Sequence, residues 1–340
     1  MHLDNPWNVS EEGFPVRGWP EEKLRFLLNY AVLAPSGHNT QPWLFRLTGD
    51  EIELYADRTR GLPVVDPEDR ALTISCGAAL FYLRIALMHF GYAGEVDTFP
   101  NPEDPDLLAR VRVGAQQEPT EEDQRLFRAI PERHSNRQAF EGRQVPGQLL
   151  SVLQTAAWEE GAWLYLTDEV ETKHKIADLI SEGDRIQHAD SRFRRELAAW
   201  MHSNRSRSRD GVPGYAFGFG DIMSAAGPLV VRTFDMGSGQ AAKDRQLAEG
   251  SPVLAVLGTE YDAPADWLAA GQALARVLLR AQAEGVSASF LNQPIEVSEL
   301  RPRLRDAIGT KGFPQLLLRM GYGPEVKPTP RRSVEEVLID

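Results

Sequence analysis

Cysteine is nearly absent from this chain of 340 residues: Cys76 is the only one, which excludes an internal disulfide framework and a cysteine-rich metal site. Positive charge is also in deficit, with 37 basic residues against 49 acidic ones and a net charge of −12. That balance argues against general binding to nucleic acid or to an anionic membrane. The first residues form no basic and apolar signal segment, and no uninterrupted apolar run reaches membrane-spanning length. We therefore expect a cytoplasmic protein.

Several common signatures of catalysis are missing as well. The glycine-rich stretch from Gly237 to Lys243 departs from the spacing of a phosphate-binding loop and lacks the Ser or Thr that should follow. No Gly-x-Ser-x-Gly elbow supports a serine hydrolase, and no Gly-x-Gly-x-x-Gly follows a strand as a dinucleotide-binding fold requires. The histidines show no pairing with carboxylates at metal-ligand spacing, so we predict no metal site. We expect Cys76 to be a small buried packing residue.

What the chain does contain is an internal repeat. The segment that begins at Gly77 matches the one that begins at Gly271, and the same offset aligns Gly91 with Gly285. The match extends to a helix and strand at 148–166, which repeat a helix and strand at 22–47. We predict an α+β fold of two fused halves, residues 20–129 and 130–340, each with a mostly antiparallel sheet flanked by helices, after an irregular arm at 1–19. Such a chain imitates a homodimer within one polypeptide.

The first candidate site is the loop from Pro35 to Trp43, which separates an apolar helix from a β-hairpin. Its prolines and glycine restrict the backbone, so that polar side chains are held where they can meet a planar heteroaromatic ligand with donors and acceptors along its edge. A helix-to-strand connection rich in turn residues accounts for the same composition. The candidate binding residues are Pro35, Ser36, Asn39 and Gln41.

The second candidate site is Arg133-x-Ser135-x-Arg137, whose two guanidinium groups and one hydroxyl lie at alternate positions and can converge on one phosphate. A solvated charged turn ahead of a helix is the alternative. The two halves differ here in a complementary way, because the first half lacks this motif and the second has only Glu159 to Ala162 in place of the long loop. One ligand site per chain, built from both halves, is the expected result.

Three further segments extend this site. Asn292 and Gln293 follow the second copy of the core helix, where they could face a ligand or satisfy the backbone of a buried strand end. Arg331, near the end of the chain, adds a basic group to this site. Arg332 is a weaker candidate, because adjacent side chains in an extended segment point to opposite faces. The basic, glycine- and aromatic-rich stretch around 200–225 suits a mobile lid, or an exposed loop that offsets the acidic surface.

The spacing Pro35-Ser36-x-x-Asn39-x-Gln41-Pro42-Trp43 resembles the signature of FMN-dependent nitroreductases, and the internal duplication resembles the twin-domain branch of that superfamily. The resemblance implies that the Pro35 loop is the one that a subunit lends to the flavin of its partner. It also implies a phosphate clamp at Arg133, Ser135 and Arg137 with Arg331 nearby, and a segment containing Asn292 and Gln293 that passes the reactive edge of the flavin.

The resemblance further implies an oxidoreductase that binds FMN and transfers hydride from NADPH or NADH, through flavin N5, to nitroaromatic or quinone-like small molecules. No catalytic side chain is expected, because the flavin carries the chemistry. A fused pseudo-dimer has no need of a partner, so we expect a monomer. The alternative within this branch is a flavin-sequestering protein whose lid stays closed, with little or no turnover. An interaction protein with a vestigial site is disfavoured, because the loop and clamp residues are retained.

Overall fold

The computed structural model describes residues 5–340 and contains two main sheets built to the same plan. The first sheet has the strand order β11-β1-β2-β4-β3 and the second β5-β8-β10-β9, and every pairing within them is antiparallel except β1 with β11. The strands of the first sheet are β1 (Trp43–Thr48), β2 (Glu51–Ala56), β3 (Tyr92–Thr98), β4 (Leu107–Gln116) and β11 (Leu338–Ile339). Those of the second are β5 (Trp163–Thr167), β8 (Val253–Thr259), β9 (Ser287–Phe290) and β10 (Phe313–Gly321).

The matching strand orders confirm the predicted fold class of two fused α+β halves. Leaving β11 aside, β1, β2, β4 and β3 correspond in order to β5, β8, β10 and β9. The helices of the first half are α1 (Pro20–Ala31), α2 (Arg70–His89) and α3 (Glu121–Ala129), and those that flank the second sheet are α4 (Gly147–Glu159), α9 (Pro264–Gln282), α10 (Gln293–Glu296) and α11 (Arg301–Ile308). The predicted elements therefore exist in the predicted order, with boundaries that differ by a few residues.

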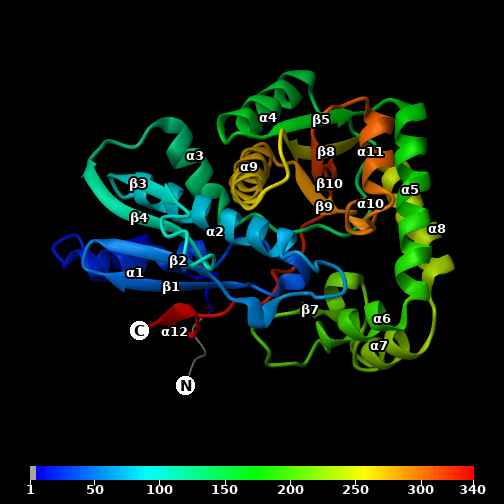
Figure 1. Ribbon diagram of the computed structural model, residues 1–340, viewed down its shortest axis with the longest axis horizontal. Helices are drawn as coiled ribbons and strands as arrows, with labels where there is room; N and C mark the ends of the chain where they lie inside the picture. The colour runs from blue at the N-terminus through cyan, green and yellow to red at the C-terminus, as the bar shows by residue number, and fades with distance from the viewer. Residues whose placement is uncertain (1–4) are drawn as a thin grey trace.

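The halves meet through α2 and α9, which Figure 1 shows in the middle of the molecule between the two sheets. Their closest approach is at the two glycines that align in the repeat. A Cβ atom at Gly77 would lie 2.2 Å from the carbonyl oxygen of Leu268, and one at Gly271 would lie 2.0 Å from that of Ile74. Only glycine permits helix backbones to approach so closely. The pseudo-two-fold contact is thus visible in the sequence as a pair of equivalent glycines.

The surroundings of α2 explain its composition. This helix is apolar on nearly every side because it packs against α1, α3, α9 and the first sheet at once. By length and apolar content alone α2 could cross a membrane, but most of its side chains are buried inside the protein. Gly91 and Gly285, which end α2 and α9, have φ values of +86° and +72°, a conformation that glycine adopts without strain.

A long insertion between β5 and β8 distinguishes the second half, since the equivalent strands β1 and β2 are joined by the tight Gly49-Asp50 turn. The insertion contains α5 (Val170–Ala189), α6 (Ser191–Ala199), β6 (Met201–His202), β7 (Val212–Pro213), α7 (Asp221–Thr233) and α8 (Gly237–Gly250). It lies to one side of the central helices (Figure 1). The stretch predicted as a lid, 200–225, contains β6, β7, the 3-10 helix η4 (Gly214–Phe217) and the start of α7 within this larger unit.

The arm from residue 5 onward and the C-terminal tail both pack against the first half. After β10 the tail returns to the first sheet, where α12 (Val334–Val337) is followed by β11, which pairs parallel with β1. In the arm, the Trp7 indole N–H donates to the carbonyl oxygen of Thr329 at 2.8 Å, and the Phe14 ring stacks on Phe90 at 4.2 Å. The arm is largely irregular and lies against the body from residue 5 onward, while residues 1–4 of its predicted span lie outside the described part.

Candidate functional site

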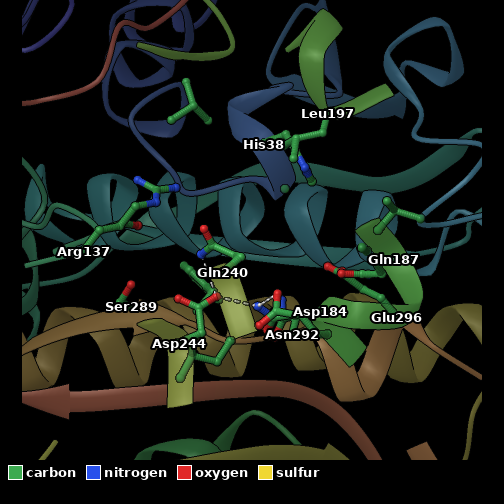
Figure 2. A pocket seen from close by; sticks show the side chains of 18 of the residues that line it. His38, Arg137, Asp184, Gln187, Leu197, Gln240, Asp244, Ser289, Asn292 and Glu296 are labelled. Carbon is green, nitrogen blue, oxygen red and sulfur yellow. Dashed lines mark hydrogen bonds between the residues drawn. The ribbon is translucent and has the colours of Figure 1, made fainter. Parts of the chain in front are cut away.

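A cavity of about 360 Å³ lies where the two halves and the insertion meet (Figure 2). One wall comes from the Pro35 loop and α2, and the opposite wall from the Arg133–Arg137 segment, β9 and β10. The insertion closes the third side, mainly with apolar side chains such as Phe193, Leu197 and Phe219. The volume of the cavity falls in the range of small-molecule and cofactor sites, which combine apolar walls with a few polar groups.

The Pro35 loop has an unusual backbone. His38, Asn39 and Gln41 have φ values of +48°, +56° and +53°, although none of them is glycine. Such conformations persist only where surrounding contacts hold them, and they concentrate at functional sites. Here the Ser36 hydroxyl accepts a hydrogen bond from the backbone N–H of Gln41 at 2.9 Å. The loop is therefore held in one shape before any ligand arrives.

Asn39, Gln41 and Arg331 lie outside the cavity wall, where they join the loop to the tail and the insertion. A guanidinium N–H of Arg331 donates to Asn39 Oδ1 at 2.7 Å, and the Asn39 amide donates to the carbonyl oxygen of Gly211 at 2.8 Å. Gln41 accepts from the backbone N–H of Arg332 and donates to the carbonyl oxygen of Arg209, both at 2.8 Å. These side chains hold the loop in position.

The remaining predicted residues, except Arg133, line the cavity. Pro35 and Ser36 contribute to one wall and Ser135, Arg137, Asn292 and Gln293 to the other. Ser135 is positioned by a parallel bridge to Ala288, just ahead of the strand residues that line the cavity. Arg133 is 4% exposed and does not line the cavity. The structure thus brings six of the ten predicted residues to one cavity.

Positive charge gathers at one end of the cavity. Arg137 and Arg319 line it, and Figure 2 shows the Arg137 side chain at this end. Among the ion pairs formed within residues 5–340, none involves Arg133, Arg137, Arg319 or Arg331. Arg319 is 1% exposed, and its Nε and Nη1 atoms have no hydrogen-bond partner. Burial lowers the pKa of Arg319 to about 10, so it stays charged at neutral pH.

Carboxyl groups also line the cavity, on α5, α8 and α10, and the charge of Asp244 acts on both Arg137 and Arg319. One amide nitrogen, Nε2 of Gln293, donates to Asp184 Oδ1 at 3.1 Å and to Asp244 Oδ2 at 2.9 Å. Glu296 accepts from the Gln187 amide at 2.7 Å. Burial raises the pKa of Asp184 to about 8 and that of Glu296 to about 7.

His38 faces the cavity from the Pro35 loop (Figure 2). Burial, together with the positive charge of Arg137, lowers the pKa of His38 to about 4. The imidazole is therefore neutral at pH 7, when it has one N–H donor and one acceptor nitrogen.

The Phe217 ring, from the insertion, lies 5.4 Å from the Arg137 guanidinium and covers it on the side of the insertion.

Sequence reasoning missed several of these groups. Arg319 carried a usable signal, because it is a charged residue within the apolar run of β10. Asp184 and Asp244 carried none, because they lie about sixty residues apart on separate polar helices and meet at Gln293 only through tertiary packing. Cys76 is fully buried as predicted, with its Sγ atom 3.1 Å from the carbonyl oxygen of Pro42.

No family model matches the chain. A Mycobacterium tuberculosis protein named as a candidate NAD(P)H nitroreductase is 33% identical over 323 residues, which cover 93% of this chain and 91% of that protein. Another M. tuberculosis protein with a name of the same kind is 28% identical, over 92% of this chain and 94% of its own length. Among solved structures, the FMN- and NADPH-dependent nitroreductase NfnB from Sphigopyxis sp. strain HMH is 20% identical with a TM-score of 0.43, covering 63% of this chain and 97% of that one.

Proposed function

Because this chain belongs to the NAD(P)H nitroreductase family, we propose that it is an FMN-binding oxidoreductase that uses NADPH or NADH to reduce nitroaromatic or quinone-like small molecules. One observation supports the cofactor assignment above the others. Buried guanidinium groups without a carboxylate partner among the described residues lie at one end of an apolar cavity between the two halves. Unneutralised buried charge is costly, and an anionic phosphate at that end would compensate it.

The residues present fit FMN on chemical grounds. Arg137, Arg319 and the Ser135 hydroxyl would hold the phosphate, while Arg133 and Arg331 add positive potential from behind the wall. The apolar side chains of α2 and the insertion would cover the faces of the ring, and polar groups at Pro35 to His38 and at Asn292 and Gln293 would meet its edge. When bound, the flavin supplies hydride transfer. The chain's task is to fix the ring, exclude water and admit the acceptor.

A single polypeptide suffices for this site. The Pro35 loop belongs to the first half and the Arg133 segment to the second, and both line one cavity. The protein would therefore act as a monomeric pseudo-dimer in the cytoplasm on small molecules, with no need of nucleic acid or membrane. The halves would divide at about residues 129 and 130, between α3 and the clamp.

The test is the visible absorption spectrum of the purified protein, recorded anaerobically after reconstitution with FMN and again after addition of NADPH or NADH. A flavin spectrum that bleaches is the expected result, and subsequent addition of 1,4-naphthoquinone should restore it. Failure to bind FMN would contradict the site assignment. Binding without bleaching by either nucleotide would contradict the reductase assignment.

Flavin sequestration is the second candidate, supported by the contacts that hold the insertion over the cavity. Arg60 pairs with Asp210, and the carbonyl oxygens of Arg209 and Gly211 accept from Gln41 and Asn39. This latch, formed by residues 209–211, fixes the predicted lid against the Pro35 loop. A lid held closed would slow access of the nicotinamide.

The Asp210→Ala variant distinguishes the two candidates. If the latch limits access, the variant should be reduced faster by NADPH, release FMN faster and be cleaved more readily by protease near the latch. Asp221→Ala is a matched control, because it removes an exposed ion pair with Arg205 in the same insertion and leaves the latch intact. Rapid reduction of the unaltered protein, unchanged by Asp210→Ala, would exclude sequestration.

A further inference from the structure

Two carboxyl groups that line the cavity share one hydrogen-bond donor. Asp184 of α5 and Asp244 of α8 each accept from Nε2 of Gln293. Asp184 is 2% exposed, and its second oxygen, Oδ2, has no hydrogen-bond partner although Asp184 lines the cavity. Figure 2 shows Asp184 beside Asn292. A buried polar atom without a partner calls for an explanation, and in the wall of a cavity that explanation is a contact to a ligand atom.

The hydrogen bonds indicate which carboxyl group holds a proton. Two carboxylates that meet at one amide repel each other, so the pair retains one proton near neutral pH. Asp244 Oδ2 accepts from a second donor, Gln240, at 3.0 Å, which stabilises its charged form. Asp184 accepts only from Gln293, through Oδ1. The proton therefore belongs on Asp184 Oδ2, which makes this atom a buried O–H donor in the wall of the cavity.

The packing around Asp184 keeps it in this state. A Cβ atom at Gly183 would lie 2.7 Å from the Gln293 Cβ, so the glycine allows α5 to approach Gln293 closely. Burial and the charge of Asp244 raise the pKa of Asp184, and burial raises that of Asp244 as well. Other charged or titratable groups that act on this pair lie on the surrounding elements: Arg185 and His188 of α5, Lys243 of α8, Glu296 of α10, Arg319 of β10, and Arg137.

We propose that Asp184 is the hydrogen-bond donor of a subsite for the electron acceptor, which it binds through a carbonyl or nitro oxygen. This subsite rests on the proposed function, since the acceptor belongs to that reaction. A neutral acceptor with an exposed oxygen matches an O–H donor set among the apolar side chains of the insertion.

The test measures binding without turnover. The FMN-loaded protein, without nicotinamide nucleotide, is titrated with 1,4-naphthoquinone from pH about 6 to about 10, across the pKa of about 8, and quenching of fluorescence reports the affinity. Above that pKa the affinity should fall towards about tenfold per pH unit, as the neutral carboxyl group is lost. Naphthalene, which has the same ring system without acceptor oxygens, should bind with no such dependence.

Two variants test the assignment to Asp184. Asp184→Asn retains a donor that does not titrate, so naphthoquinone affinity should become independent of pH while the protein still binds FMN. Asp244→Asn removes the neighbouring charge, so the loss of affinity should move to lower pH. A pH dependence that persists unchanged in Asp184→Asn would overturn the proposal.

Two further results separate this inference from the proposed function. A protein that binds FMN and is reduced by NADPH, but binds naphthoquinone equally at every pH, would overturn the subsite alone. If the FMN affinity falls across the same pH range while the naphthoquinone affinity stays constant, Asp184 donates to the cofactor. That result would also overturn the acceptor subsite. Failure to bind FMN would contradict the proposed function and this inference together.

Discussion

Replacing Arg319 with methionine should weaken FMN binding and leave the ligand-free protein as stable as before or more stable. Arg319 is 1% exposed, has no carboxylate partner among residues 5–340, and has two guanidinium nitrogens without hydrogen-bond partners. Burial lowers the pKa of Arg319 to about 10. This shift means that keeping the side chain charged costs the folded protein about 3 kcal/mol. Because the folded pKa lies below the unfolded one, this cost is present at neutral pH and decreases only as the pH rises through about 10.

The expected magnitudes follow from what methionine removes and keeps. It relieves the cost of burying the charge, keeps much of the contact with the Phe140 ring, and loses the hydrogen bond from Arg319 Nη2 to the carbonyl oxygen of Asn136 at 3.1 Å. An unsatisfied carbonyl costs about 1–3 kcal/mol, so the free energy of unfolding should be unchanged or rise by up to about 2 kcal/mol. A charge-assisted contact to phosphate contributes about 2 kcal/mol, so the FMN dissociation constant should rise about thirtyfold.

Urea denaturation of the ligand-free protein and fluorescence titration with FMN measure the two effects separately. Arg143→Met is a matched control: it removes the same charge from an exposed arginine that stacks on Tyr322 at 3.9 Å outside the cavity. Both of its effects should stay within about 1 kcal/mol. An Arg319→Met variant that loses several kcal/mol of stability and binds FMN normally would show that Arg319 supports the fold and does not contact the phosphate.

Three other changes test the site and its frame. Gly77→Ala would place its Cβ 2.2 Å from a backbone oxygen and should lower the free energy of unfolding in urea by about 1–3 kcal/mol. Gly239→Ala, in open space on α8, should raise it by up to about 1 kcal/mol. Equal effects of the two variants would contradict the close helix contact. Because the pKa of His38 is lowered to about 4 in the folded protein, the melting temperature should fall as the pH is lowered from about 6.5 to about 4. In His38→Asn, whose new side chain tolerates the positive φ, the melting temperature should change less across that range. Ser135→Ala should raise the FMN dissociation constant by about fivefold, from the loss of about 1 kcal/mol, and an unchanged value would remove this hydroxyl from the phosphate site.

Much of the scaffold could be read from local patterns. Apolar periodicity located α1, a nearly continuous apolar run located α2, and the internal repeat located α9. The apolar residues on either side of the Gly49-Asp50 turn located the first hairpin. Gly77 and Gly271 marked the closest contact between the halves, since a close helix crossing demands glycine on both sides. These signals depend on residues near one another in sequence or on an exact internal repeat, so one sequence is enough to reveal them.

The character of the cavity was decided by tertiary packing. Asn39 and Gln41 stand in the signature loop, yet positive φ values turn them towards the tail and residues 209–211, so they hold the loop and do not line the cavity. The insertion covers the site with four helices, although only part of it carried a lid-like composition. Asp184 and Asp244 meet at Gln293 from three separate helices. Contacts between distant segments leave no periodic pattern, so the sequence specified the two halves, while packing determined which polar groups line the cavity.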